Sequence, residues 1–289
     1  MRRQTVILLL VSLWASTASP PLQAMTCDAP GIITPPQLIV GTLNVAHGRK
    51  EARNQVFLEV EEVRQNLLDL SESLDRAGAD MMALQEVDAP SWWSGDFDHV
   101  EFLAAHSSYP CFLHGVHAST RLYDFGTALL SPHPLQGGFV HSFPPSWPTT
   151  AKGMTVAALD WNPDNRLAEP LRVKFVSVHL DFSRHSVRRA QIDEMVRVLG
   201  KLEGPLVVMG DFNTDWKTDG SSLRVLADRL GLAAYAPHAE GLATYGDDGA
   251  RLDWILVSPG LRFEHYAVYP DVVSDHYAVV AALTWNPER

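Results

Sequence analysis

The chain has 289 residues, of which 46% are hydrophobic and 20% are charged, values that are ordinary for a globular protein with a sizeable core. The formal net charge is −11, so the overall field of the protein does not attract polyanions. This disfavours tight nucleic-acid binding, but it does not exclude a phosphate substrate that a divalent cation would help to hold.

The first 24 residues have the order of an export signal. Met-Arg-Arg is followed by an apolar run over residues 6–15 and then by small residues up to Leu22-Gln23-Ala24, which resembles a signal-peptidase site. A membrane anchor would need about 20 apolar residues, and the run is interrupted at residues 16–21. We therefore predict that residues 1–24 are cleaved and that the mature chain is secreted or periplasmic, with no transmembrane anchor.

The chain has two cysteines, Cys27 and Cys111. An oxidising compartment allows them to form a disulfide, but their spacing does not show whether the geometry closes. A bridge and two separate buried thiols both stay open. A lipid anchor at Cys27 is disfavoured, because residues 24–26 lack the leucine and the small residue that such a site requires.

Hydrophobic patterning predicts alternating strands and helices along the chain. The apolar residues of segment 54–77 recur at three- and four-residue steps before Gly78, which indicates an amphipathic helix that packs on a strand at 81–84. Further strands are expected at 38–43, 128–131, 155–161, 171–180, 206–209, 252–257 and 277–285, further helices at 97–106, 186–202 (capped by Ser186) and 222–230, and irregular segments at 90–98 and 143–148.

Neighbouring strands such as 155–161 and 171–180, joined by a polar turn, favour antiparallel pairing. We predict an α/β fold with two packed, mixed and largely antiparallel sheets and helices outside them. The candidate site residues run from Asn44 to His276, and any domain boundary between these would divide the site. Residues 25–37 are therefore assigned to an N-terminal extension and residues 38–289 to one domain.

Polar side chains stand where the predicted strands end. Such groups converge on one rim of a sheet even when the chain keeps them far apart. Hard cations such as Mg²⁺ prefer oxygen ligands of this type, whereas the chain has no His-Glu-x-x-His zinc motif. Each residue alone is also a common turn former, but together they favour a cation site: Asn44, Glu86, Asp211, Asn213 and Asp275.

Two histidines lie in comparable positions. His276 follows Asp275 and precedes an apolar strand, and His179 stands near the end of the strand at 171–180. Either histidine alone can be a structural imidazole. If a carboxylate orients His276, however, its imidazole can transfer a proton or stabilise charge beside a metal-bound phosphate. Asp253 is the best candidate for that carboxylate.

Seven short motifs then occur in an order that is typical of one protein family. They are TLNVAHG, LQEVD, GTALLS, VHLD, GDFNT, RLDWILVS and SDHYAV. From Leu38 to Leu283 the chain resembles the endonuclease/exonuclease/phosphatase superfamily, the deoxyribonuclease I-like metal-dependent phosphoesterases. The resemblance implies a four-layer sandwich of two sheets and outer helices, which agrees with the layering predicted from the residues.

The resemblance also implies a role for each matching residue. By this resemblance, Glu86 is expected to be the principal metal ligand, with Asn44 and Asp275 as further ligands. Asp211 and Asn213 are expected to position or deprotonate the attacking water and to hold the phosphate.

The remaining matches supply an imidazole and substrate contacts. By the same resemblance, Asp253 and His276 are expected to form an acid–imidazole couple, and His179 is expected to contact the phosphate. Two positions depart from the family pattern. Tyr123 stands one step earlier than the tyrosine of many members, and Lys152 stands where many carry arginine, which keeps the charge but loses the bidentate fork.

The predicted loop at 90–98 contains Trp92 and Trp93. Because it follows Glu86 closely, the loop is a candidate platform for a base, a sugar-like ring or a lipid headgroup. We assign Trp93 to substrate binding together with Tyr123 and Lys152. An equally simple explanation for Trp92 and Trp93 is that they pack at the edge of the hydrophobic core and contact no substrate.

These observations predict a phosphoesterase that hydrolyses a P–O bond with the help of Mg²⁺, or of another hard divalent cation such as Mn²⁺ or Ca²⁺. The expected substrate is a phosphate ester in a nucleic acid, an inositol phosphate or a phospholipid headgroup, and likeness of fold does not choose among them. A monomer is expected. The alternative is a non-catalytic secreted binding protein that uses the same rim as a ligand pocket.

Overall fold

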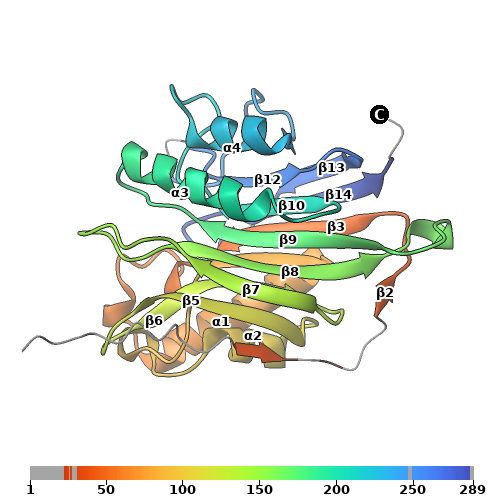
Figure 1. Cartoon of the computed structure of the whole chain (residues 1–289). Coiled ribbons are helices and arrows are strands. Elements are labelled where there is room, and N and C mark those ends of the chain that lie inside the picture. Colours follow the sequence, from red (N-terminus) through yellow and green to blue (C-terminus); the bar gives the residue numbers. More distant parts are fainter. Residues whose placement is uncertain (1–22, 26, 28–30, 247–248, 287–289) are drawn as a thin grey trace, which may run out of the picture.

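The computed structural model describes residues 23–25, 27, 31–246 and 249–286 (Figure 1). Most of the predicted signal, residues 1–22, lies outside the described residues, as does part of the predicted N-terminal extension. Among the described residues, no helix is both long enough and apolar enough to cross a membrane.

Two seven-stranded sheets form the centre of the molecule. The first has the order β1 (Gln23–Met25), β5 (Cys111–Ser119), β6 (Asp124–Ser131), β4 (Met81–Asp88), β3 (Leu38–Asn44), β14 (Val279–Trp285) and β13 (Leu261–Val268). The second has the order β11 (Ala233–Ala234), β12 (Asp253–Val257), β10 (Leu206–Asp211), β9 (Leu171–His179), β8 (Gly153–Trp161) and β2 (Ile32–Ile33), and β7 (Gln136–Ser142) also pairs with β8.

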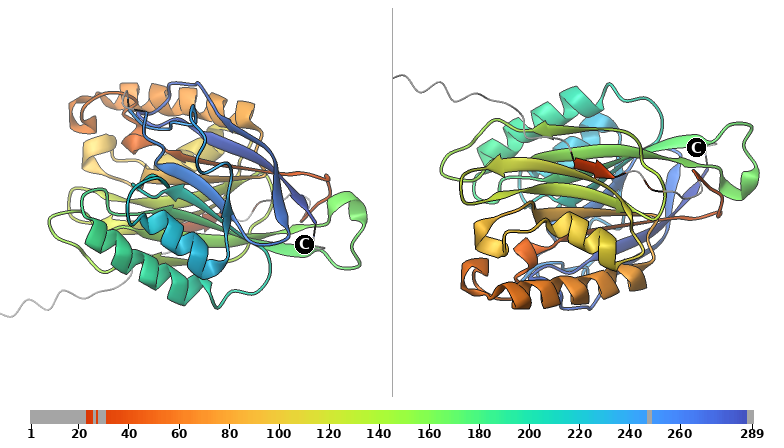
Figure 2. Two further views of the ribbon diagram at one scale, coloured as in Figure 1. Left: turned by 90° about the horizontal axis from the view of Figure 1, so that it is seen from above. Right: turned by 90° about the horizontal axis from the view of Figure 1, so that it is seen from below.

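In the described part of the chain, four α-helices cover the outer faces of the two sheets. Apolar side chains of α1 (Val60–Ala77) and α2 (His99–His106) pack on the first sheet, and those of α3 (His185–Leu199) and α4 (Ser222–Leu230) pack on the second. A separate core, which includes Phe175, lies between the sheets. Figure 2 shows α1 on one side of the sheets and α3 with α4 on the other. The predicted two-sheet α/β sandwich with outer helices is confirmed.

Most predicted elements are present, with two corrections. The predicted helix at 54–77 is interrupted: a short 3₁₀ turn at Gln55–Phe57 precedes α1, which begins with a capping box between Glu59 and Glu62. Ser186 is not the cap of α3, because the helix already begins at His185 with Arg184 in the capping position.

Strands β5, β7 and β13 were not predicted from the sequence, nor were the short strands β1, β2 and β11. Eight of the nine residues of β5 are buried, so the strand has no alternation of apolar and polar side chains, and histidines interrupt its apolar run. Strand β7 contains two glycines, and in both β7 and β13 polar side chains interrupt the alternation of apolar and polar residues that would indicate a strand.

Strand direction brings the site residues to one edge. β3 runs parallel to β4, and β9 runs parallel to β10, so each pair ends at the same edge of its sheet. β14 is antiparallel to β3, β12 is antiparallel to β10 and β8 is antiparallel to β9, so these three strands begin there. The side chains at strand ends and at strand starts therefore face one another.

Gly210 allows β9 and β10 to approach at this edge. Its φ is +148°, and a Cβ atom at this position would collide with the carbonyl oxygen of Val178. The close approach of the two backbones requires glycine. It places Asp211 directly opposite His179 in the register of the two strands.

A disulfide joins Cys27 to Cys111, with their Cα atoms 5.4 Å apart. The bridge ties the segment before β2 to the start of β5. Cys27 and Cys111 therefore form a bridge and are not two separate buried thiols.

Candidate functional site

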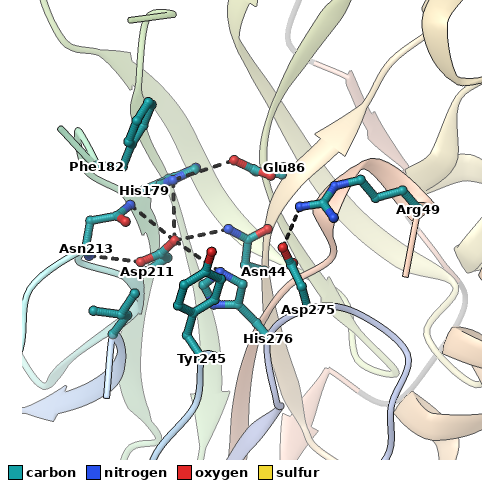
Figure 3. Close-up of a pocket in the computed structure, with 11 residues that line it drawn as sticks. Asn44, Arg49, Glu86, His179, Phe182, Asp211, Asn213, Tyr245, Asp275 and His276 are labelled. Carbon is teal, nitrogen blue, oxygen red and sulfur yellow. Dashed lines mark hydrogen bonds and ion pairs between the residues drawn. The ribbon is translucent and has the colours of Figure 1, made fainter. Parts of the chain in front are cut away.

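A cavity of about 430 Å³ opens where the ends of the two sheets meet. In Figure 3, Glu86 and Arg49 lie on one side of it, Phe182 and Asn213 lie on the other, and Asp211 and Asn44 lie between them. Eight polar or charged side chains and three mainly apolar ones line this space: Asn44, Arg49, Glu86, His179, Asp211, Asn213, Asp275 and His276, with Phe182, Tyr245 and Leu252.

Asp211 lies at the centre of the hydrogen bonds in this cavity. Its Oδ2 accepts from Asn44 Nδ2 at 3.1 Å and from Asn213 Nδ2 at 3.2 Å, and its Oδ1 accepts from the Asn213 backbone N–H at 2.9 Å. Burial and the neighbouring Asp253 carboxylate raise the pKa of Asp211 to about 7. A carboxylate with such a pKa is suited to accept a proton near neutral pH.

His276 and Asp253 form the predicted acid–imidazole couple across the two sheets. His276 Nδ1 lies 2.8 Å from Asp253 Oδ2, and His276 Nε2 lies 4.0 Å from Asp211 Oδ2. Burial opposes the charge on the imidazole, but Asp253 and Asp211 outweigh it and raise the pKa of His276 to about 10. His276 is therefore a positively charged donor.

His179, in contrast to His276, is neutral. Its Nε2 lies 3.5 Å from Asp211 Oδ2, and its Nδ1 lies 3.2 Å from Lys152 Nζ. Burial and the Lys152 ammonium hold the pKa of His179 well below its ordinary value. Lys152 does not line the cavity itself, but it also lies 3.6 Å from Glu86 Oε1.

The donor set at one end of the cavity fits a hard divalent cation. Burial would keep Glu86 protonated, but the positive charges of His47 and Lys152 outweigh it and hold the pKa of Glu86 well below its usual range. An ionised carboxylate, with Asn44 and Asp275 lining the same cavity (Figure 3), matches the oxygen ligands that Mg²⁺ prefers.

A second group of possible ligands is less suitable. Asp211, Asp253 and His276 each place one ligand atom within 4.8 Å of the others. His276 is protonated and contacts Asp253 through Nδ1, so its imidazole does not offer a free lone pair. The cation therefore fits better at Glu86.

The structure does not bring Trp93 and Tyr123 into the cavity. Trp93 Nε1 donates to Asp88 Oδ2 at 2.7 Å, and its ring stacks on Tyr123 with the centroids 4.2 Å apart. The two rings pack on each other outside the cavity, which agrees with the alternative that the tryptophans pack at the edge of the core. This arrangement follows from a hydrogen bond to Asp88 that the sequence motifs did not indicate.

Several residues that line the cavity were not predicted from the sequence to belong to the site. Arg49 Nη2 donates to Asp275 Oδ2 at 2.5 Å, and Phe182 and Tyr245 form an aromatic rim. The Tyr245 ring lies 4.6 Å from the His276 ring. Arg49 and Phe182 directly follow the motifs that contain Asn44 and His179, and this adjacency was the one available signal.

Comparison with known proteins agrees with this geometry. The profile of the Endonuclease/Exonuclease/phosphatase family matches residues 41–276. A family protein from Leptotrichia buccalis has a TM-score of 0.63 at 18% identity, over 86% of this chain and 100% of that chain. The human Nocturnin catalytic domain with bound sulfate anion has a TM-score of 0.64 at 18% identity, over 92% and 98% of the two chains.

A mannosyl-6-phosphatase from Bacteroides thetaiotaomicron has a TM-score of 0.60 at 17% identity, over 86% of this chain and 100% of that chain. At these identities the solved structures establish a shared fold. No curated protein has a significant sequence match to this chain.

The charge pairing in the site predicts a pH-dependent stability. Because the pKa of His276 is raised to about 10 from 6.5, its pairing stabilises the fold fully below pH 6.5 and loses this contribution as the pH rises to about 10. We expect Asp253→Asn to lower the free energy of unfolding by about 3 kcal/mol near pH 6 and by less near pH 10. Urea denaturation of metal-free protein measures this, and an equal loss at both pH values would contradict the pairing.

Proposed function

Because the chain belongs to the endonuclease/exonuclease/phosphatase family, we propose that it is a divalent-metal-dependent phosphoesterase that hydrolyses a P–O bond by in-line attack of water. The observation that carries this proposal is the meeting of Glu86, Asp211 and His276 in one cavity. Their environments give them three different protonation behaviours, which is how carboxyl and imidazole groups acquire separate roles in acid–base catalysis.

The cation would lie at the end of the cavity that contains Glu86. Glu86 would be its principal ligand, with Asn44 and Asp275 beside it, and Mg²⁺ is the expected ion. A bound dication would polarise a phosphoryl oxygen and stabilise the charge that develops on the leaving oxygen. The ionised state of Glu86 supports this assignment.

The residues at the centre of the cavity act on the water and the phosphate. Asp211 orients the attacking water and accepts its proton, while the amide of Asn213 holds Asp211 in place. His276, kept charged by Asp253, donates to a phosphoryl oxygen as negative charge increases there. His179 is neutral and therefore carries one N–H group, through which it donates a hydrogen bond to the phosphate.

The substrate is a phosphate ester in a nucleic acid, an inositol phosphate or a phospholipid headgroup. Nocturnin and the mannosyl-6-phosphatase share this fold, so the fold alone does not choose the substrate. The second candidate function is a binding protein that uses the cavity as a ligand pocket. The complete set of ionisable groups in the cavity favours hydrolysis over simple binding.

We propose that the protein is exported and that residues 1–24 are removed, so that the mature chain keeps only Met25 of strand β1. The basic start and apolar run of this segment support the proposal, as does the disulfide of Cys27. In a secreting host, the mass of the protein recovered outside the cytoplasm should correspond to a chain that begins at Met25. A recovered chain that still begins at Met1 would contradict cleavage.

Single substitutions test the residue roles. We expect Glu86→Ala, Asp211→Ala and His276→Ala each to lower kcat/KM by roughly 10²- to 10⁴-fold, because each removes a group that acts on the reacting atoms. Asp160→Ala is the matched control, since this acid pairs with Arg172 outside the cavity. Circular dichroism checks that each variant is folded. Wild-type activity in all three folded variants would remove the assignment.

Metal removal and a substrate panel test the reaction class. Bis-(p-nitrophenyl) phosphate, plasmid DNA and sphingomyelin are each incubated with Mg²⁺ or with a chelator. We expect turnover of at least one substrate with Mg²⁺, loss of turnover in chelator and recovery when Mg²⁺ or Mn²⁺ is added back. If metal binds but none of the three substrates is hydrolysed, the binding-protein function is favoured instead.

A further inference from the structure

Glu86 projects from an irregular part of its strand. The register of β4 against β6 shifts between Gln85 and Val87, and Glu86 itself has a left-handed backbone with φ of +53°. A bulge of this kind re-aims a side chain, and a left-handed non-glycine residue persists only where its surroundings hold it. The position of the Glu86 carboxylate therefore depends on contacts outside its own strand.

His47 supplies such a contact from the turn after β3. Its Nε2 lies 3.4 Å from Glu86 Oε2, and its Nδ1 lies 2.6 Å from Asp88 Oδ1. The imidazole thus bridges two carboxylates that are two positions apart on β4. His47 is buried and also has a left-handed backbone, with φ of +56°.

Asp88 is itself fixed by further donors. It is fully buried, and its Oδ2 accepts from Trp93 Nε1 at 2.7 Å and from the Ser94 hydroxyl. The rings of Trp93 and Phe125 lie 5.1 Å and 4.8 Å from the His47 ring. The imidazole is therefore held by packing on its sides and by a fixed carboxylate at one nitrogen.

We propose that His47 and Asp88 are positioning residues that aim the Glu86 carboxylate at the cation. The inference rests on the proposed function, in which Glu86 is the principal metal ligand. With Oε2 next to His47, Oε1 lies 3.9 Å from Nε2 of His179, which lines the cavity, and 3.6 Å from Lys152 Nζ beneath it. The 3.4 Å contact between His47 and Glu86 is an ion pair, and neighbouring groups that hold a metal ligand in this way fix its orientation and thereby raise metal affinity.

Calorimetric titration of the purified protein with Mn²⁺, without substrate, tests the proposal. His47→Phe keeps a planar ring but removes both nitrogens, and we expect the dissociation constant for Mn²⁺ to rise roughly 10- to 100-fold. Glu86→Ala should weaken binding at least as much. His141→Phe is the matched control, because it breaks a 2.7 Å contact with Glu194 outside the cavity and should leave the affinity unchanged.

Conservative variants separate the contact with Glu86 from simple packing. His47→Gln retains an amide nitrogen that can lie near the position of Nε2, whereas His47→Asn retains one only near Nδ1, towards Asp88. Asparagine tolerates the left-handed backbone better than most residues, so this variant should fold. We expect tighter Mn²⁺ binding by the Gln variant than by the Asn variant.

The outcomes distinguish this inference from the proposed function. Wild-type Mn²⁺ affinity in folded His47→Phe, beside weakened binding in Glu86→Ala, would overturn the positioning role and leave the metal site standing. Wild-type affinity in Glu86→Ala would overturn the metal site and the positioning role together. If His47→Phe does not fold, equal affinities of the Gln and Asn variants would overturn the positioning role.

Discussion

The hydrogen bond from Asn44 to Asp211, 3.1 Å long, joins the ends of strands that belong to different sheets. Both side chains are largely buried, so separating them would cost a hydrogen bond to a charged group that few solvent contacts could replace. A second link lies beneath it, where Gln85 Nε2 donates to Ser177 Oγ at 3.0 Å. These contacts fix the relative position of the two sheets at the edge where the cavity opens.

Burial gives this edge its electrostatic character. In a poorly solvated site each charge depends on its immediate neighbours, so two histidines in one cavity acquire different charge states. His276 faces Asp253 and stays charged, whereas His179 faces the Lys152 ammonium and stays neutral. The separation of roles therefore arises from the partner of each imidazole.

Three residues in or beside the same cavity have unfavourable backbone conformations. Glu86, Asn213 and His47 all have positive φ, although none of them is glycine. Such conformations cost about 1–3 kcal/mol each, and the surrounding contacts must offset that cost. The register shift at Glu86 and the tight turn at Asn213 both direct side chains into the cavity, which regular strand geometry alone would not do.

The sequence by itself determined the fold class, the positions of most strands and helices, and the group of residues that meets at one edge. Hydrophobic periodicity and polar residues at strand ends are local patterns, and they placed Glu86, Asp211 and His276 correctly at strand ends that converge. Only the tertiary structure decided that Arg49 lies in the cavity and that Trp93 does not. It also decided which histidine is charged, because charge state and side-chain direction depend on neighbours that are distant in the chain.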